Sequence, residues 1–132
     1  MIVYESGSGW LYNPPNPAVK GYAGGDCGKA PQGKNNPDME SLHNVGPLPR
    51  GLYTLGTPIE GSHLGPFAIP LIPDPANEMY GRSGFFCHGD SIESPGNASN
   101  GCIIMPRAVR EQMWASIDHT LRVVGINGED VS

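Results

Sequence analysis

The residues best suited to covalent chemistry lie in two short segments, one that ends in a histidine and one that contains a cysteine. Phe85 and Phe86 predict a half-buried strand over residues 84–88, with His88 at its rim and Gly89 allowing the chain to turn away. Cys102 follows fourteen residues after His88. An imidazole beside a thiol promotes loss of its proton, so we expect a nucleophilic Cys102 with a lowered pKa.

The residues around Cys102 are suited to holding a developing negative charge. Gly101 precedes the cysteine and permits tight backbone packing, so that neighbouring N–H groups can converge on one point. Such a group of donors stabilises the oxyanion of a tetrahedral intermediate. The competing interpretation is that Cys102 is a small buried hydrophobic residue, as single cysteines often are.

The remaining cysteine and histidine residues give weaker signals. Cys87 alternates with His88 along the strand, which predicts that Cys87 faces the core. His43, His63 and His119 have no reactive neighbour in the sequence. No spacing of cysteine and histidine supports zinc ligation, so we expect neither a metal nor a cofactor.

Turn-forming residues are so frequent up to about residue 105 that strands and loops must dominate there. Residues 2–4 and 10–12 flank a Ser-Gly-Ser-Gly turn and predict a hairpin. Further strands are predicted over residues 52–56, 67–72 and 84–88. Residues 21–44 are rich in Gly, Asn and Pro, and they predict a long ordered loop that roofs the catalytic cleft.

One helix is predicted after Pro106, a residue tolerated in the first turn. Val109, Met113, Ile117 and Leu121 recur every four residues and indicate one buried face, with His119 at the end of the helix. Charged residues on the other positions are expected to face solvent, with Arg107 as the exception. This solvated group is Arg110, Glu111 and Asp118. Residues 121–126 are expected to close the sheet as a last strand before a polar tail.

Length and composition place limits on the function. The 132 residues fit one domain, taken here as residues 1–132, and 38% hydrophobic residues suffice for a modest core although Gly and Pro make up a quarter of the chain. A formal net charge of −5 without any basic run excludes nucleic acid and anionic membranes as main partners. No apolar run is long enough to span a membrane.

The start of the chain and the cysteines bear on the compartment. Residues 1–10 lack the basic and apolar regions of a secretory signal, so we expect synthesis as a soluble cytoplasmic protein. Three cysteines without a C-x-x-C pair leave at least one free thiol. A Cys27–Cys87 bridge remains open for an oxidising compartment.

The segments around His88 and Cys102 resemble the signature of L,D-transpeptidases, in which a histidine-containing strand precedes a Ser/Thr-x-Gly-Cys segment. The wider chain, from about residue 4 to 124, is similar to the type VI secretion L,D-transpeptidase effectors. The motifs that carry this resemblance are Gly21-Tyr22, Gly33-Lys34-Asn35-Asn36-Pro37, the segment 44–51, Gly81-Arg82-Ser83-Gly84, His88-Gly89 and Ser99-Asn100-Gly101-Cys102. The resemblance implies a mainly β fold, a compact antiparallel sandwich or barrel with one helix after the cysteine.

The resemblance also implies roles for individual residues. His88 would accept the proton of Cys102 or form an ion pair with it, and Gly89 would orient the imidazole through its carbonyl. The backbone N–H groups of Gly101 and Cys102, with help from Asn100, would hold the oxyanion. The chain has Asn100 where housekeeping members carry a second histidine, and Ile104 where they carry an arginine. Candidate substrate-binding residues are Tyr22, Arg82, Ser83, Asp90, Ser99 and Arg107, of which the two arginines would bind substrate carboxylates and Ser99 would shape the turn.

The implied activity is acyl transfer on the tetrapeptide stems of peptidoglycan, by hydrolysis, by exchange of D-alanine or by cross-linking. The implied partners are a secretion apparatus that delivers the protein to the periplasm of rival bacteria and an immunity protein in the producer. Two alternatives stay open at this stage. One is a β-rich module that binds cell wall or glycan without catalysis, and the other is a phage lysis enzyme with the same site.

Overall fold

The computed structural model describes residues 1–61 and 63–126. Its α-helix in this part of the chain is α1 (Arg107–Ala115), which follows Cys102 as predicted. Three short 3-10 segments precede it, η1 (Asp26–Gly28), η2 (Pro31–Gly33) and η3 (Pro37–Met39). The strands are β1 (Ile2–Glu5), β2 (Trp10–Tyr12), β3 (Val19–Lys20), β4 (Tyr22–Ala23), β5 (Gly51–Leu55), β6 (Ile69–Pro73), β7 (Phe86–His88), β8 (Ile103–Ile104) and β9 (Thr120–Val124).

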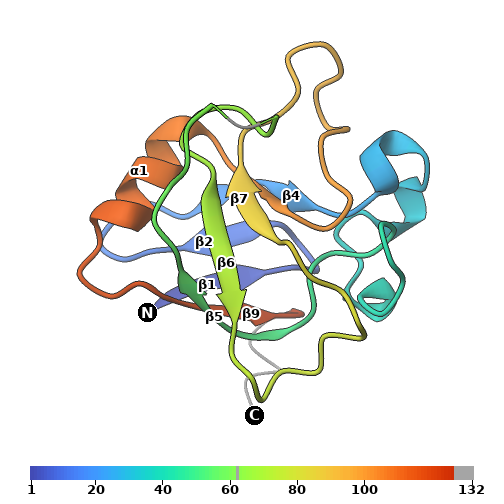
Figure 1. Cartoon of the computed structure of the whole chain (residues 1–132), viewed down its shortest axis with the longest axis horizontal. Coiled ribbons are helices and arrows are strands. Elements are labelled where there is room, and N and C mark those ends of the chain that lie inside the picture. The colour runs from blue at the N-terminus through green and yellow to red at the C-terminus, as the bar shows by residue number, and fades with distance from the viewer. Residues whose placement is uncertain (62, 127–132) are drawn as a thin grey trace.

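The strands form one strongly curved, barrel-like sheet in the order β3-β2-β1-β9-β5-β6-β7-β8-β4. Most neighbours are antiparallel, but β1 pairs with β9, and β7 with β8, in parallel. Figure 1 shows β6 and β7 on the near side, β1 and β2 behind them, and α1 against one flank. The predicted mainly β architecture with a helix after the cysteine is confirmed.

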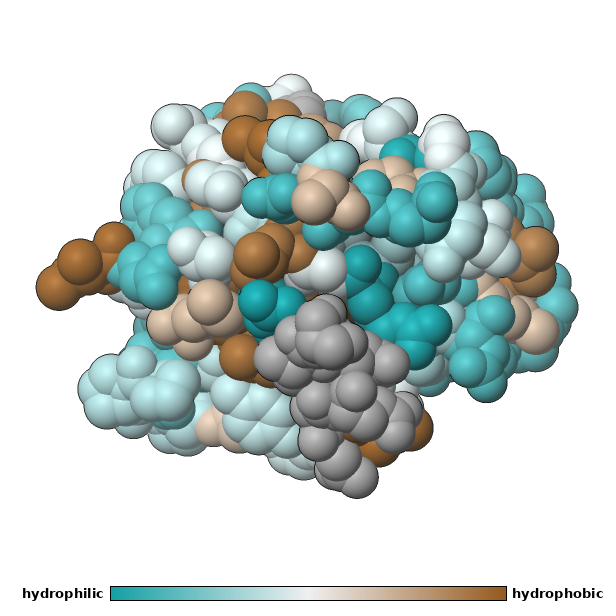
Figure 2. Space-filling view, turned by 90° about the horizontal axis from the view of Figure 1, so that it is seen from below, coloured by the Kyte–Doolittle hydropathy of each residue, from teal (hydrophilic) through white to brown (hydrophobic). Residues whose placement is uncertain are grey.

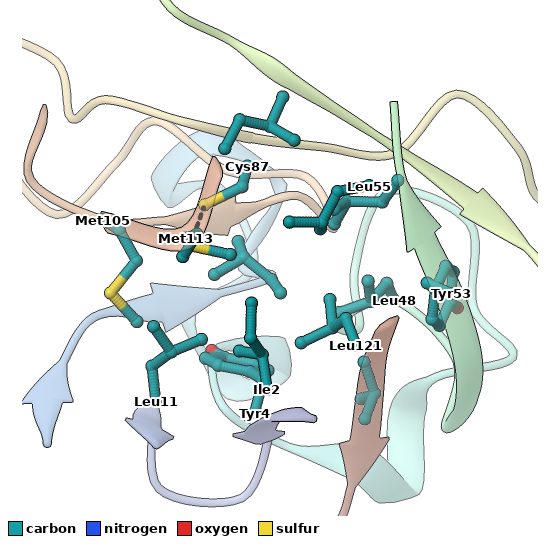
Figure 3. Packing of buried hydrophobic residues seen from close by; sticks show 14 of the residues in the cluster. Ile2, Tyr4, Leu11, Leu48, Tyr53, Leu55, Cys87, Met105, Met113 and Leu121 are labelled. Carbon is teal, nitrogen blue, oxygen red and sulfur yellow. Dashed lines mark hydrogen bonds between the residues drawn. The ribbon is translucent and has the colours of Figure 1, made fainter. Parts of the chain in front are cut away.

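Apolar side chains from opposite walls of the curved sheet and from α1 fill the interior. Figure 3 shows Cys87 from β7 facing Met113 from α1, with their sulfur atoms 4.0 Å apart. Cys87 is fully buried, which confirms its predicted place in the core. This burial raises the pKa of its thiol to about 12. The hydroxyl of Tyr4 is also buried here without a hydrogen-bond partner among the described residues.

The predicted hairpin and strands are present with shifts of one or two residues at their ends. The predicted helix is wrong in length, because it ends at Ala115. Ile117 is fully exposed, and Leu121 reaches the core from β9 instead. Strand β9 lies between β1 and β5 and is hydrogen-bonded to both. The pairing of this last strand therefore outweighs the four-residue spacing that predicted a longer helix.

Two side chains near this helix also differ from the sequence-based prediction. Arg110 is buried rather than solvated, and its guanidinium donates to the carbonyl oxygens of Met105, Pro66 and Phe67 at 2.9–3.1 Å. His119 lies beyond the helix, where its ring stacks on Trp114 with centroids 4.1 Å apart. Both groups therefore pack against the domain. The predicted polar tail after residue 126 lies outside the described residues.

The long loop predicted over residues 21–44 contains β4 and the three 3-10 segments. Figure 1 places these segments on the flank opposite α1. Strand β4 pairs with β8 directly after Cys102, which joins the loop to the segment of this cysteine. The loop is therefore an ordered wall beside the cysteine.

The cysteines are free, with Cys27 exposed and Cys87 buried, so the Cys27–Cys87 bridge that the sequence left open is absent. None of the described helices is long and apolar enough to cross a membrane. Figure 2 shows a face on which hydrophilic side chains predominate and hydrophobic ones lie in separate small groups.

Candidate active site

The parallel pair of β7 and β8 brings the histidine and cysteine segments together. Cys87 pairs with Ile103 and His88 with Ile104, so Cys102 lies at the start of β8, level with Phe86. The backbone N–H of Phe86 donates to the Cys102 sulfur at 3.3 Å. The two segments thus meet on neighbouring strands of the curved sheet.

Cys102 lies where two open clefts meet. The larger cleft, about 570 Å³, is lined by both His88 and Cys102, and we call it the histidine cleft. The smaller one, about 320 Å³, contains Cys102 and the segment around Arg82, and we call it the arginine cleft. Asn100 lines both.

The imidazole of His88 is held in one tautomer by its neighbour. Its Nδ1 lies 2.9 Å from the carbonyl oxygen of Gly89, and because a carbonyl only accepts, Nδ1 carries the proton. This leaves Nε2 as the basic nitrogen, in agreement with the predicted orienting role of Gly89. Burial, together with the nearby charge of Arg110, lowers the pKa of His88, although the bond to Gly89 raises it. The ring is thus neutral near pH 7.

The thiol of Cys102 does not match the predicted lowered pKa. The residue is only 7% exposed, and this burial raises its pKa above the ordinary value. The N–H of Phe86 and the charge of Arg82 act in the opposite direction but do not outweigh burial. The free protein therefore holds a neutral thiol and a neutral imidazole in the same cleft, and the ion pair left open from sequence is disfavoured.

The turn before Cys102 is fixed by the buried hydroxyl of Ser99. This Oγ donates to the Cys102 carbonyl at 2.6 Å and accepts the N–H groups of Gly24 and Gly101. Ser99 thus shapes the turn, as predicted. The N–H of Gly101 is occupied, which is a correction to its predicted place among the oxyanion donors. The N–H of Cys102 and the exposed Asn100 amide remain as candidates.

Arg82 lies beneath the same turn and is almost completely buried. Its guanidinium donates to four carbonyl oxygens, those of Glu40, Gly46, Pro47 and Asn100. It also lies over the ring of Phe85, 5.1 Å from its centroid. The guanidinium of Arg82 therefore binds the protein's own backbone. This favours a positioning role for Arg82 over the predicted binding of a substrate carboxylate.

Tyr22 and Asp90 form a hydrogen-bonded pair that holds the loop between the two catalytic segments. The Tyr22 hydroxyl donates to Asp90 and accepts the N–H of Ala98 at 2.9 Å. Asp90 also accepts the N–H groups of Ser91 and Gly96. Although burial acts to raise the pKa of Asp90, these hydrogen bonds lower it. Both residues line clefts, but their polar groups are engaged.

The other predicted substrate-binding residues differ in position. Ser83 is exposed in the arginine cleft beside Cys102. Arg107 lies outside both clefts of the cysteine and pairs with Glu111 at 3.2 Å and with Glu60 at 4.0 Å.

The sequence analysis missed several residues of the histidine cleft, among them Cys27, His63 and Leu64. They come from loops far from both motifs, and no local pattern marks them. Among the described residues, no group of three or more metal-binding side chains lies together.

Comparison with known proteins agrees with the signature built by these residues. A search of curated proteins gives no match. The family model of the Tlde1 domain matches residues 19–128, which include β4, both catalytic segments, α1 and β9. Since this match covers most of the sequence and the fold is mainly β, the chain belongs to the Tlde1 domain family of type VI secretion L,D-transpeptidase effectors.

Proposed function

We propose that the protein is a cysteine acyl-transfer enzyme that acts on the tetrapeptide stems of peptidoglycan in target bacteria. The observation that carries the proposal is the shared cleft of His88 and Cys102, in which Nδ1 of the histidine is bound and Nε2 is left as the base. Family membership supports an enzyme of L,D-transpeptidase type. It disfavours the two alternatives left open from sequence, a wall-binding module and a phage lysis enzyme.

In the proposed first half-reaction each of these groups has one role. Nε2 of His88 accepts the thiol proton as the sulfur attacks the carbonyl of the L-centre of meso-diaminopimelate. The Cys102 N–H and the Asn100 amide hold the oxyanion, each donor contributing about 3 kcal/mol. The C–N bond then breaks, and His88 returns the proton to the amine of D-alanine. A thioester on Cys102 remains.

The second half-reaction depends on what attacks the thioester. Water releases a tripeptide stem, a free D-amino acid exchanges for D-alanine, and an amine of another stem forms a cross-link. Two clefts that meet at Cys102 give room for a stem on one side and an attacking group on the other. We propose hydrolysis and exchange as the main outcomes, since both need only a small second substrate.

The test is a digest of purified tetrapeptide muropeptides followed by mass spectrometry. We expect loss of D-alanine with the native protein, a mass shift when D-methionine is added, and neither product with Cys102→Ala. Ile117→Ala is the control, because Ile117 is fully exposed and lines neither cleft of Cys102. An unchanged digest with the native, folded protein would overturn the proposal.

A further inference from the structure

A third cleft lies next to the histidine cleft and contains an unusual arginine. Arg110 is only 5% exposed, and its Nε and Nη1 donate to three carbonyl oxygens. Its Nη2 has no hydrogen-bond partner among the described residues. This nitrogen is not fully enclosed by the protein. The N–H groups of Nη2 are therefore available to an acceptor in the cleft.

The surroundings of Nη2 favour an anionic group. The cleft has a volume of about 460 Å³ and is lined by Arg110, Lys20 and Arg107, with Met105 among its apolar residues. The one acid on its wall, Asp90, is engaged by Tyr22, Ser91 and Gly96. Arg107 is paired with Glu111 and Glu60. Arg110 and Lys20 therefore supply the cationic charge that is left for a ligand.

Gly89 connects this cleft to the active site. The residue lines both clefts, and its carbonyl binds Nδ1 of His88. A Cβ at position 89 would lie 3.0 Å from Nη2 of Arg110, so Gly89 lies against this nitrogen and a larger residue would crowd it. A ligand bound to Arg110 would thus lie directly across Gly89 from the catalytic histidine.

We propose that this third cleft binds a free carboxylate of the stem peptide, through Nη2 of Arg110 with Lys20 at the rim. The inference rests on the proposed function and adds a specificity-determining residue to it. The leaving D-alanine carboxylate is adjacent to the scissile bond and must stay near Cys102. The carboxylate at Arg110 is therefore a remote one, on the D-centre of diaminopimelate or on the D-glutamate.

Binding to the inactive Cys102→Ala protein tests the inference without catalysis. Calorimetry would compare the free tetrapeptide with two versions, each amidated at one of these remote carboxylates. We expect one amidated peptide to bind at least about tenfold more weakly, the loss expected for a hydrogen bond to a charged group. Adding Arg110→Gln should abolish this difference, whereas Lys29→Gln, which removes an exposed cation of equal charge, should leave it unchanged.

Two further outcomes keep this inference separate from the proposed function. If Arg110→Gln does not fold, Lys20→Gln replaces it and should reduce the preference for the free carboxylate. Equal binding of all three peptides would overturn the carboxylate site, while release of D-alanine by the native protein would still support the acyl-transfer function. Absence of D-alanine release with a retained preference would overturn the function and not the site.

Discussion

The protonation states of Cys102 and His88 determine how the reaction begins. Burial raises the pKa of the thiol and lowers the pKa of the imidazole, so both groups are uncharged in the free protein near pH 7. Proton transfer must then accompany attack on the substrate, as in general base catalysis. A resting thiolate–imidazolium pair would require the opposite shift at both residues.

The first prediction concerns the pH dependence of thiol reactivity. Because alkylation requires the thiolate, the rate at which iodoacetamide modifies Cys102 should rise continuously between pH 6 and 9, without a plateau. Intact-mass spectrometry measures the rate, and Cys102→Ala supplies the contribution of the exposed Cys27. A plateau below pH 8 would demonstrate a stable thiolate and contradict the neutral pair.

The same shifts predict the acidic limb of the activity profile. His88 acts as a base only when neutral, and its pKa is lowered from 6.5, so kcat/KM should fall only as the pH drops below about 6.5.

Gly101 tests how tightly the nucleophile turn is packed. Its φ is +144°, and a Cβ would lie 2.7 Å from both Nη2 of Arg82 and the ring of Phe85. We expect Gly101→Ala to lower the free energy of unfolding by about 3 kcal/mol, from backbone strain and displacement of Arg82. Gly84→Ala is the matched control, because Gly84 also has positive φ but nothing within 4 Å, and it should lose about 1 kcal/mol. Equal losses in urea unfolding would contradict this packing.

Sequence reasoning identified the residues that belong to a recognisable motif and missed those that only the tertiary structure brings together. His88, Gly89 and Cys102 were predicted because their order and glycine neighbours have a chemical meaning. The buried role of Arg110 depends on carbonyl groups of residues 66–67, which are more than forty positions away. A helical pattern assigns such a residue to solvent, since the pattern contains no information about distant backbone acceptors.

At the scale of elements, the end of α1 shows how pairing of a strand competes with helix periodicity. Ser116 already has extended backbone, and β9 begins at Thr120 between β1 and β5. Leu121 therefore enters the core at a strand position, although its spacing from Met113 fits a helix equally well. The four-residue spacing alone cannot distinguish these two ways of burying a leucine.

Two side-chain truncations test where the buried face of the helix ends. Met113 is fully buried against Cys87, so Met113→Ala should destabilise the protein by about 2–4 kcal/mol. Ile117 is fully exposed, and Ile117→Ala should change stability by less than about 0.5 kcal/mol. Urea unfolding followed by tryptophan fluorescence measures both. A large loss for Ile117→Ala would show that the helix extends beyond Ala115.

At the scale of the whole molecule, glycine and proline have a definite place in the fold. The chain carries a quarter of its residues as Gly and Pro, yet none of them lies in α1. Gly24, Gly33 and Gly46 each approach backbone of another segment so closely that a Cβ would clash. This composition permits the wall of loops beside Cys102. The predominance of strands was predictable from turn frequency and the barrel-like sheet from the family resemblance, whereas the meeting of the loops was not predictable.

The last prediction concerns the compartment in which the enzyme acts. Peptidoglycan stems are outside the cytoplasm, so we expect expression in the cytoplasm of a Gram-negative host to be tolerated and export to the periplasm with an added signal sequence to inhibit growth. Growth curves and muropeptide profiles of the same cultures measure both effects. Exported Cys102→Ala should be harmless, and a periplasmic protein that covers the histidine cleft should restore growth. Equal growth in the two compartments, with the exported protein detected in folded form, would contradict a wall-directed activity.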